Sequence, residues 1–139
     1  MSVIPKVIHQ TYKTHTVPDH WVESHESWKA LETQGWTYRL WDDTDIRALI
    51  EEHFPSFLKT FDAYPQGINR ADAWRYFVLY HEGGIYVDLD LVCKPNFLTF
   101  YEHVKNEQVV LSETAGSHGY KDQNLTNAFM MSQPGAAFW

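Results

Sequence analysis

The sequence predicts a single α/β domain, and two observations lead to this prediction. Short β-branched or aromatic segments alternate with segments whose apolar residues recur at helical spacing, in the order strand, helix, strand, helix. A further helical segment then runs through a pair of glycines into an apolar strand. The 139 residues are about 44% apolar, enough for one core and too few for two. We therefore expect one domain over residues 1–139.

The first half of the chain supplies two strands and two helices. Residues 6–12 follow a proline and read as a strand with polar residues at its far end. Residues 21–31 carry apolar side chains at helical spacing, and a glycine follows as a stop. Residues 36–41 alternate as in a strand. Residues 42–54 begin with acidic capping candidates and end at Pro55, which predicts a second helix.

The second half predicts a long helix and three strands. The helix "NRADAWRYFVLYHEGG" has Asn69 as its expected N-cap and Gly83 as a left-handed C-cap, and leads into the strand "GGIYVDLDLV" over residues 83–92. Residues 106–113 and 127–135 read as two more strands. Four tryptophans at strand or helix positions are expected in the core: Trp28, Trp36, Trp41 and Trp74.

Composition excludes some classes of function. A formal net charge of −7 and the lack of a Lys/Arg cluster argue against nucleic-acid binding. The single cysteine, Cys93, cannot form an internal disulfide, which favours a reducing compartment. The first residues contain neither a signal pattern nor the ~18 apolar residues of a transmembrane segment. We expect a soluble, cytoplasmic protein.

Two aspartates lie one residue apart in the strand after the glycine pair. In an extended strand Asp88 and Asp90 point to the same face, with about 6.6 Å between their Cα atoms. The expected buried face is the other one, with Ile85, Val87, Leu89 and Leu91. Two close carboxylates repel unless a cation lies between them, and a hard divalent ion prefers oxygen ligands. The doublet therefore predicts a metal shared with a phosphate-bearing substrate.

The preceding helix places two more charged residues at the same edge of the sheet. Counted back from Gly83 at ~1.5 Å per residue, Arg75 and Asp72 lie about 12 and 16 Å away. Asp88 and Asp90 lie about 13 and 20 Å along the returning strand. All four residues are expected at the carboxyl edge of the strand, where open α/β sheets bind ligands.

Other interpretations fit parts of this pattern. The doublet could be a solvated strand edge, and Asp72 with Arg75 a surface ion pair. A D-x-D phosphatase of the haloacid dehalogenase type would use Asp88 as nucleophile and Asp90 as acid and base. A nucleotide-sugar or carbohydrate-binding module with weak catalysis is a third alternative. The three histidines His15, His20 and His25 do not have zinc-site spacing and are expected to be solvated.

A family resemblance extends over nearly the whole chain, in order. The segments "IPKVIHQTYK", "LWDDTDIRALI", "INRADAWRYFVLYHEGGIYVDLDLVCKP" and "NAFMMSQPG" resemble the D-x-D glycosyltransferases of family thirty-two. The joined R-A-D-x-x-R-Y and G-G-I-Y-x-D-x-D motifs are also similar to the catalytic core of large clostridial glucosylating toxins. The resemblance implies the Rossmann-like type A glycosyltransferase fold, with a mixed central sheet flanked by helices.

The resemblance also implies an activity and a set of residues. The reaction would be metal-dependent, retaining transfer of a hexose from a UDP- or GDP-linked sugar to a glycan or lipid-linked acceptor. Asp88 and Asp90 would hold Mn²⁺ or Mg²⁺ and, with Arg75, carry catalysis. The expected donor-binding residues are His9, Gln10, Thr11, Tyr12, Arg70, Asp72 and Arg75. Among these, Tyr12 is placed where its ring could stack on the base.

The chain departs from the family pattern near its end. In "QPGAAFW", Ala136 and Ala137 stand where family members commonly have a histidine and a proline, so a further metal or phosphate ligand is unaccounted for. The chain could be a fragment, a minimal enzyme or a form that needs a partner. Membrane-anchored relatives carry an N-terminal span, and its absence here favours the bacterial or viral cytoplasmic type.

Overall fold

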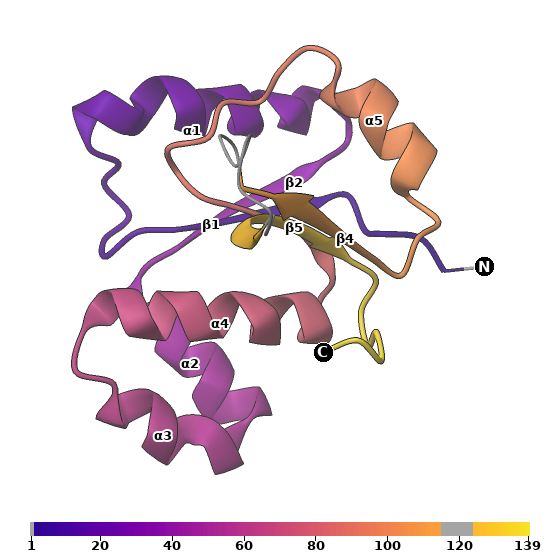
Figure 1. The fold of residues 1–139 in the computed structure, drawn as a ribbon. Coiled ribbons are helices and arrows are strands. Elements are labelled where there is room, and N and C mark those ends of the chain that lie inside the picture. The colour runs from indigo at the N-terminus through magenta and orange to yellow at the C-terminus, as the bar shows by residue number, and fades with distance from the viewer. Residues whose placement is uncertain (1, 115–123) are drawn as a thin grey trace.

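The protein has a five-stranded mixed sheet between two layers of helices (Figure 1). A computed structural model describes residues 2–114 and 124–139. The strands are β1 (Val7–Thr11), β2 (Thr37–Trp41), β3 (Gly84–Val87), β4 (Val109–Glu113) and β5 (Leu125–Ser132), in the spatial order β2-β1-β3-β5-β4. Strand β1 pairs in parallel with β2 and β3, whereas β5 is antiparallel to β3 and β4. The predicted α/β class with a mixed central sheet is confirmed.

The helices cover both faces of the sheet. Helix α1 and α5 lie on one face, and α2, α3 and α4 lie on the other (Figure 1). Their bounds are α1 (Val22–Lys29), α2 (Asp43–His53), α3 (Leu58–Ala63), α4 (Gly67–His81) and α5 (Phe97–Val104), with short 3-10 helices η1 (Asp19–Trp21), η2 (Ala30–Gln34) and η3 (Pro55–Phe57). Trp28 and Trp36 are buried in one core cluster, and Trp41 and Trp74 in the other, as predicted.

The ends of the helices follow local sequence signals. Helix α2 starts at a reciprocal capping box, in which the Asp42 side chain accepts from the Asp45 backbone N–H at 2.8 Å and the Asp45 side chain accepts from the Asp42 N–H at 3.1 Å. The expected cap of α4 is wrong, because the helix begins earlier, at Gly67 after Gln66, and Asn69 lies inside it. Gly83 has the predicted left-handed conformation, with φ of 68°.

The second glycine of the pair is required by the sheet. Gly84 has φ of 98°, and a Cβ atom there would lie 2.6 Å from the Val7 carbonyl oxygen on the neighbouring strand β1. A side chain at this position would therefore push β3 away from β1. The glycine pair turns the chain out of α4 and allows the close parallel pairing that brings the end of β3 beside the end of β1.

The strand with the two aspartates is shorter than predicted. Strand β3 ends at Val87, and the chain turns at once, with the Leu91 N–H donating to the Asp88 carbonyl at 3.1 Å. Asp88 and Asp90 therefore belong to a turn, and the expectation that alternation puts them on one strand face is wrong. Both faces of β3 are covered by helices, so Tyr86 is buried as fully as Ile85.

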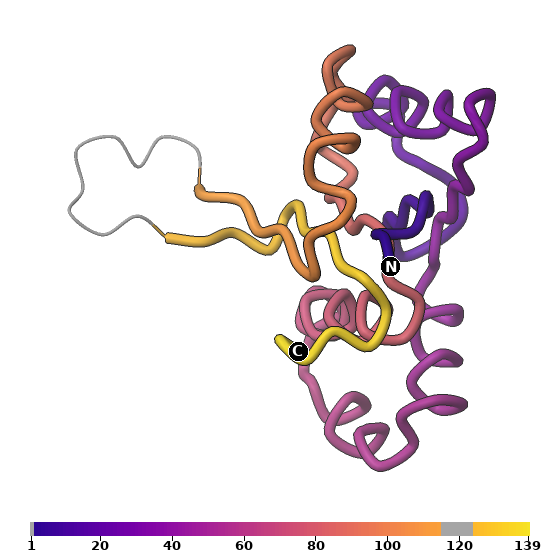
Figure 2. The backbone as a smooth tube through the Cα atoms, turned by 90° about the vertical axis from the view of Figure 1, so that its right-hand side faces the viewer, coloured from indigo at the N-terminus to yellow at the C-terminus, as the bar shows by residue number. Residues whose placement is uncertain are grey.

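Helices α3 and α5 were not expected from the sequence. The predicted final strands are confirmed as β4 and β5, which run together away from the body of the domain (Figure 2). Among the residues that the structure describes, no helix has the length and apolar character needed to cross a membrane.

Candidate active site

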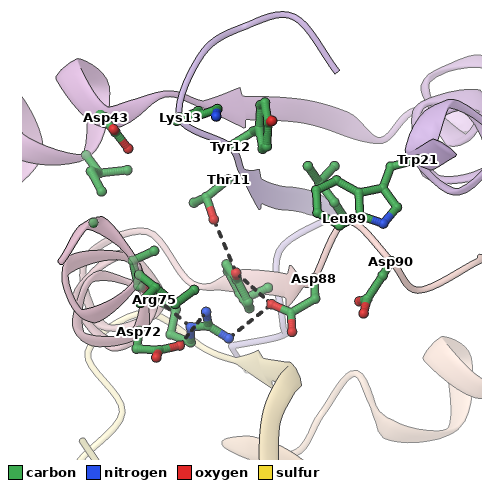
Figure 3. Close-up of a pocket in the computed structure, with 15 residues that line it drawn as sticks. Thr11, Tyr12, Lys13, Trp21, Asp43, Asp72, Arg75, Asp88, Leu89 and Asp90 are labelled. Atoms are coloured by element: carbon green, nitrogen blue, oxygen red, sulfur yellow. Dashed lines mark hydrogen bonds and ion pairs between the residues drawn. The ribbon is translucent and has the colours of Figure 1, made fainter. Parts of the chain in front are cut away.

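A cavity of about 540 Å³ lies at the carboxyl ends of the parallel strands β1 and β3 (Figure 3). This is the edge at which open α/β sheets bind ligands. Its walls come from the end of β1, the segment around η1, the starts of α2 and α4, and the turn after β3. The lining residues are Thr11, Tyr12, Lys13, Trp21, Asp43, Ile46, Gly67, Ile68, Ala71, Asp72, Arg75, Tyr86, Asp88, Leu89 and Asp90.

A buried arginine connects two of the predicted carboxylates. The Arg75 guanidinium is 3% exposed; its Nη2 forms an ion pair with Asp72 Oδ1 at 2.9 Å, and its Nη1 donates to Asp88 Oδ1 at 3.1 Å. It also donates to the backbone carbonyls of Asn127 at 2.8 Å and Ala71 at 3.4 Å. Asp72, Arg75 and Asp88 therefore lie together, as predicted, and Arg75 also connects them to strand β5 through Asn127.

The Asp88 carboxylate is fixed by a second donor. The Tyr86 hydroxyl donates to Asp88 Oδ1 at 2.9 Å and lies 3.3 Å from the Thr11 hydroxyl on β1. The Arg75 guanidinium lies over the Tyr86 ring, 4.2 Å from its centroid, so the phenol contacts the cation and the carboxylate together. Oδ1 of Asp88 is thereby occupied, whereas Oδ2 has no hydrogen-bond partner in the described part of the chain.

The charge of Asp88 is only partly compensated. Burial raises the pKa of the Asp88 carboxyl, and the nearby Arg75 cation and the Tyr86 hydrogen bond oppose that rise. A cation placed next to Oδ2 would relieve the remaining cost of burying the negative charge. The site is therefore electrostatically suited to a positively charged ligand.

Asp90 lies in the turn after Asp88 and lines the same cavity, so the predicted doublet does meet in one site (Figure 3). Its side chain is exposed and makes no hydrogen bond or ion pair within residues 2–114 and 124–139. The turn is held by the Asp88 carbonyl, which accepts from the Leu91 N–H at 3.1 Å and from Gln10 Nε2 at 3.3 Å. Two carboxylates with free oxygens are the ligand type that Mn²⁺ and Mg²⁺ prefer.

Three expected donor-binding residues lie outside the cavity lining. His9 is fully buried: its Nε2–H donates to the Gly83 carbonyl at 2.9 Å, and its Nδ1 accepts from Trp41 Nε1 at 3.2 Å. Gln10 is also fully buried and contacts Asp88 only through the backbone carbonyl. Arg70 donates to the Tyr64 carbonyl at 2.8 Å. His9 and Gln10 therefore do not reach the cavity, because both side chains on β1 are buried between the sheet and its helices.

The buried environment of His9 determines its charge. Burial lowers the pKa of His9 to about 4, against a smaller opposing effect of its hydrogen bond to Gly83. Both ring nitrogens are satisfied in the neutral Nε2–H tautomer, and a proton on Nδ1 would face the Trp41 N–H. His9 is therefore a neutral residue that connects β1, β2 and the glycine turn.

Several lining residues were not expected from the sequence. Lys13, Trp21 and Asp43 come from the loop after β1, from η1 and from the start of α2. Trp21 was assigned to the apolar face of a helix, whereas its ring lies edge-on to Tyr12, with 5.9 Å between ring centroids. The proline-bearing loop that brings Trp21 back over the end of β1 has no periodicity, so no sequence signal indicated this contact.

A histidine and two aspartates form another polar group, at the N-terminus of α2. His15 Nε2 lies 2.6 Å from Asp45 Oδ2, and His15 Nδ1 lies 3.4 Å from Asp42 Oδ2. Both carboxylates already serve the capping box of α2. The contacts of His15 attach the loop after β1 to that helix, and its side chain is 59% exposed, so the expected solvated position of this histidine is confirmed.

The fold and the cavity define the class of protein. A mixed α/β sheet carries a helix-borne Asp and Arg and a D-x-D turn at the carboxyl edge of its parallel strands. A solved structure titled PaToxG Glycosyltransferase shares this fold, with a TM-score of 0.54 and 20% sequence identity over 97% of this chain and 57% of that one. The predicted type A fold is confirmed.

The chain belongs to the family described as the glycosyltransferase sugar-binding region containing a DXD motif, whose model matches residues 18–114. It is 48% identical over 94 residues to mannosyl phosphorylinositol ceramide synthase SUR1 of Saccharomyces cerevisiae, which covers 67% of this chain and 24% of that protein. It is 47% identical over 92 residues to inositol phosphoceramide mannosyltransferase 3 of Schizosaccharomyces pombe, covering 66% and 26%. The chain thus spans about a quarter of the length of these relatives. Membership of this family does not favour the phosphatase alternative.

Proposed function

We propose that this chain is the donor-binding and catalytic region of a metal-dependent, retaining mannosyltransferase that uses a nucleoside diphosphate sugar. The observation that carries the proposal is the Asp72–Arg75–Asp88 chain of ion pairs in the cavity that also contains Asp90. The relatives named as mannosyltransferases support mannose as the hexose. Because two of them are named for inositol phosphoceramide, the proposed acceptor is a glycolipid with a hydroxyl-rich headgroup, and a glycan is the alternative acceptor.

The metal would be held by Asp88 and Asp90, as Mn²⁺ or Mg²⁺. When bound, it would supply positive charge to the leaving diphosphate, an effect usually worth several kcal/mol in the transition state. Asp88 offers Oδ2, because Oδ1 is held by Arg75 and Tyr86, and Asp90 offers both oxygens. The chemistry of two free carboxylate groups supports the assignment.

Arg75 is better described as a positioning residue than as a free phosphate ligand. A guanidinium has five N–H donors; three of them donate to Asp88, Asn127 and Ala71, and the other two are on Nη2, which forms the ion pair with Asp72. The N–H groups of Nη2 are therefore the ones that a donor molecule could share with Asp72. The main role proposed for Arg75 is therefore to orient the two carboxylates and to keep positive charge beside the diphosphate.

Asp72 and Tyr12 would contact the two ends of the donor. The Asp72 side chain is 47% exposed, and one oxygen is held by Arg75, which leaves the other to accept from sugar hydroxyls. The half-buried ring of Tyr12 lies next to exposed Lys13, with 5.7 Å from Lys13 Nζ to the ring centroid. Stacking of a base on such a ring contributes about 1 to 3 kcal/mol.

The test is a donor-turnover assay with anomeric detection. The protein is incubated with GDP-mannose, UDP-glucose or p-nitrophenyl phosphate, with Mn²⁺ or with EDTA, and products are followed by proton NMR. The proposal expects Mn²⁺-dependent release of α-mannose from GDP-mannose, with the anomeric configuration retained, and no phosphatase activity. Binding without any sugar release would favour the binding-module alternative, and release of β-mannose would contradict retention.

A further inference from the structure

The segment that carries Asp90 is attached to helix α1 by three hydrogen bonds. Trp28 Nε1 donates to the Leu91 carbonyl at 2.8 Å, and the Cys93 N–H donates to Ser27 Oγ at 2.9 Å. The Ser24 hydroxyl donates to the Leu89 carbonyl. Residues 89–93 therefore depend on α1 for three of their backbone hydrogen bonds, although α1 lies more than sixty positions earlier in the sequence.

These bonds act on both sides of Asp90. The carbonyls of Leu89 and Leu91, its immediate neighbours, point to α1, while Asp90 itself lines the cavity. The Asp88 side chain is oriented by two donors of its own, whereas the Asp90 side chain makes no polar contact in the described part of the chain. The position of the Asp90 carboxylate is thus set by its backbone, and the backbone is set by α1.

The same helix connects this turn to the cavity wall. The Ser24 hydroxyl has one proton and lies within hydrogen-bond distance of two carbonyls, that of Leu89 and, at 3.0 Å, that of Trp21. Ser27 donates to the Ser24 carbonyl at 2.6 Å while it accepts from Cys93. Both serines are therefore part of one network that fixes Trp21 and the Asp90 turn relative to each other.

We propose that Ser24, Ser27 and Trp28 are positioning residues for the Asp90 metal ligand, so that α1 sets the metal affinity of the donor site without touching metal or donor. This inference rests on the proposed function in one respect, that Asp90 holds the metal. Partners of metal ligands commonly change metal affinity by 10- to 100-fold when removed. Since one of three attachments is lost in each variant, we expect a change of about tenfold.

The variant pair Trp28→Phe and Trp36→Phe separates positioning from packing. Both tryptophans are buried in the same core cluster and contact Phe97, so both variants lose a similar amount of packing. Only Trp28 donates to the turn; Trp36 Nε1 has no such bond among the described residues. Ser27→Ala is a second test, because it removes the acceptor of the Cys93 N–H with little loss of volume.

The measurement is the Mn²⁺ concentration that gives half-maximal binding of GDP, and separately of UDP, by calorimetry. We expect Trp28→Phe and Ser27→Ala to need about tenfold more Mn²⁺. Excess Mn²⁺ should restore full binding, and Trp36→Phe should match the wild type. Without metal, hydrogen exchange at the Cys93 amide should be about tenfold faster in Ser27→Ala.

Three outcomes overturn the inference, and they are distinguishable. If the wild type binds GDP and UDP with no dependence on Mn²⁺, the proposed metal site fails and the inference fails with it. If the wild type needs Mn²⁺ but Trp28→Phe and Ser27→Ala need no more of it than Trp36→Phe does, the metal site stands and the positioning role is wrong. A Cys93 amide that exchanges equally fast in Ser27→Ala and wild type also contradicts the role.

Discussion

Replacement of Arg75 by methionine should destabilise the protein even without ligands. Methionine fills a similar volume but leaves the Asp88 carboxylate without its cation and the Asn127 carbonyl without its donor. The Asp88 hydrogen bond involves two charged groups, a class worth about 1.5 to 3 kcal/mol, and the lost carbonyl partner and the Tyr86 contact add about 1 kcal/mol each. Asp72 is 47% exposed, so its pair contributes little.

The expected loss of unfolding free energy for Arg75→Met is therefore about 3 to 5 kcal/mol, measured by urea denaturation in EDTA. Arg47→Met is the matched control, because Arg47 also pairs with two carboxylates, Asp62 and Glu51, but at the surface. Its denaturation midpoint should stay close to that of the wild type. Adding Asp88→Asn to Arg75→Met should recover part of the loss, since it removes the uncompensated charge. Equal denaturation midpoints for Arg75→Met and Arg47→Met would refute the proposed contribution of the buried Arg75 contacts to stability.

Three further predictions concern the donor, His9 and the glycine turn. Asp72→Asn should weaken binding of GDP-mannose by about 1.5 to 3 kcal/mol and leave GDP binding unchanged; equal losses for both ligands in calorimetry would remove its sugar contact. His9 stays neutral in the fold while the unfolded chain takes up a proton near pH 6.5, so about 3 kcal/mol of stability should be lost as the pH falls from 6.5 to 4. In NMR the His9 ring should not titrate above pH 5, and a midpoint near 6.5 would contradict this. Gly84→Ala should cost more stability than Gly135→Ala by several kcal/mol, because only the former meets a carbonyl oxygen; similar melting temperatures would contradict it.

The convergence of Asp72, Arg75 and Asp88 could be predicted because it depends on regular geometry. An α-helix and a β-strand each have a fixed rise per residue. Distances along both can therefore be counted from the Gly83 turn at which they meet. The structure then adds the contacts that regular geometry does not include. The Tyr86 hydroxyl and the Asn127 carbonyl reach the same group from β3 and β5.

The turn at Asp88 and Asp90 could not be predicted in the same way. "IYVDLDLV" alternates apolar and polar residues as an extended strand does, so periodicity favours a strand through Val92. Asp88 still donates to the Ala128 carbonyl of β5 at 2.8 Å, but the residues after it form hydrogen bonds with α1, and the strand itself ends at Val87. Those partners are distant in sequence, and no local pattern encodes them.

The position of His9 and Gln10 outside the cavity could not be predicted for a related reason. Polar residues at the end of a predicted strand suggested an open edge near the ligand. In the structure β1 is the central parallel strand, and helices cover both of its faces, so of the four residues expected to contact the donor there only Thr11 and Tyr12 line the cavity. The buried His9 ring forms hydrogen bonds with Gly83 and Trp41, and the buried Gln10 side chain forms them with Tyr38 and the Asp88 carbonyl.

Calorimetric titration of the protein with GDP-mannose and UDP-glucose, in Mn²⁺ and in EDTA, tests the metal site most directly. The Asp88→Asn and Asp90→Asn variants keep the side-chain volumes, and Asp43→Asn is the control, because Asp43 lines the cavity outside the proposed metal site. We predict Mn²⁺-dependent binding of one donor to the wild type and to Asp43→Asn, and loss of that binding in both other variants, which should remain folded. Undiminished Mn²⁺-dependent binding in Asp88→Asn and Asp90→Asn would contradict the metal site.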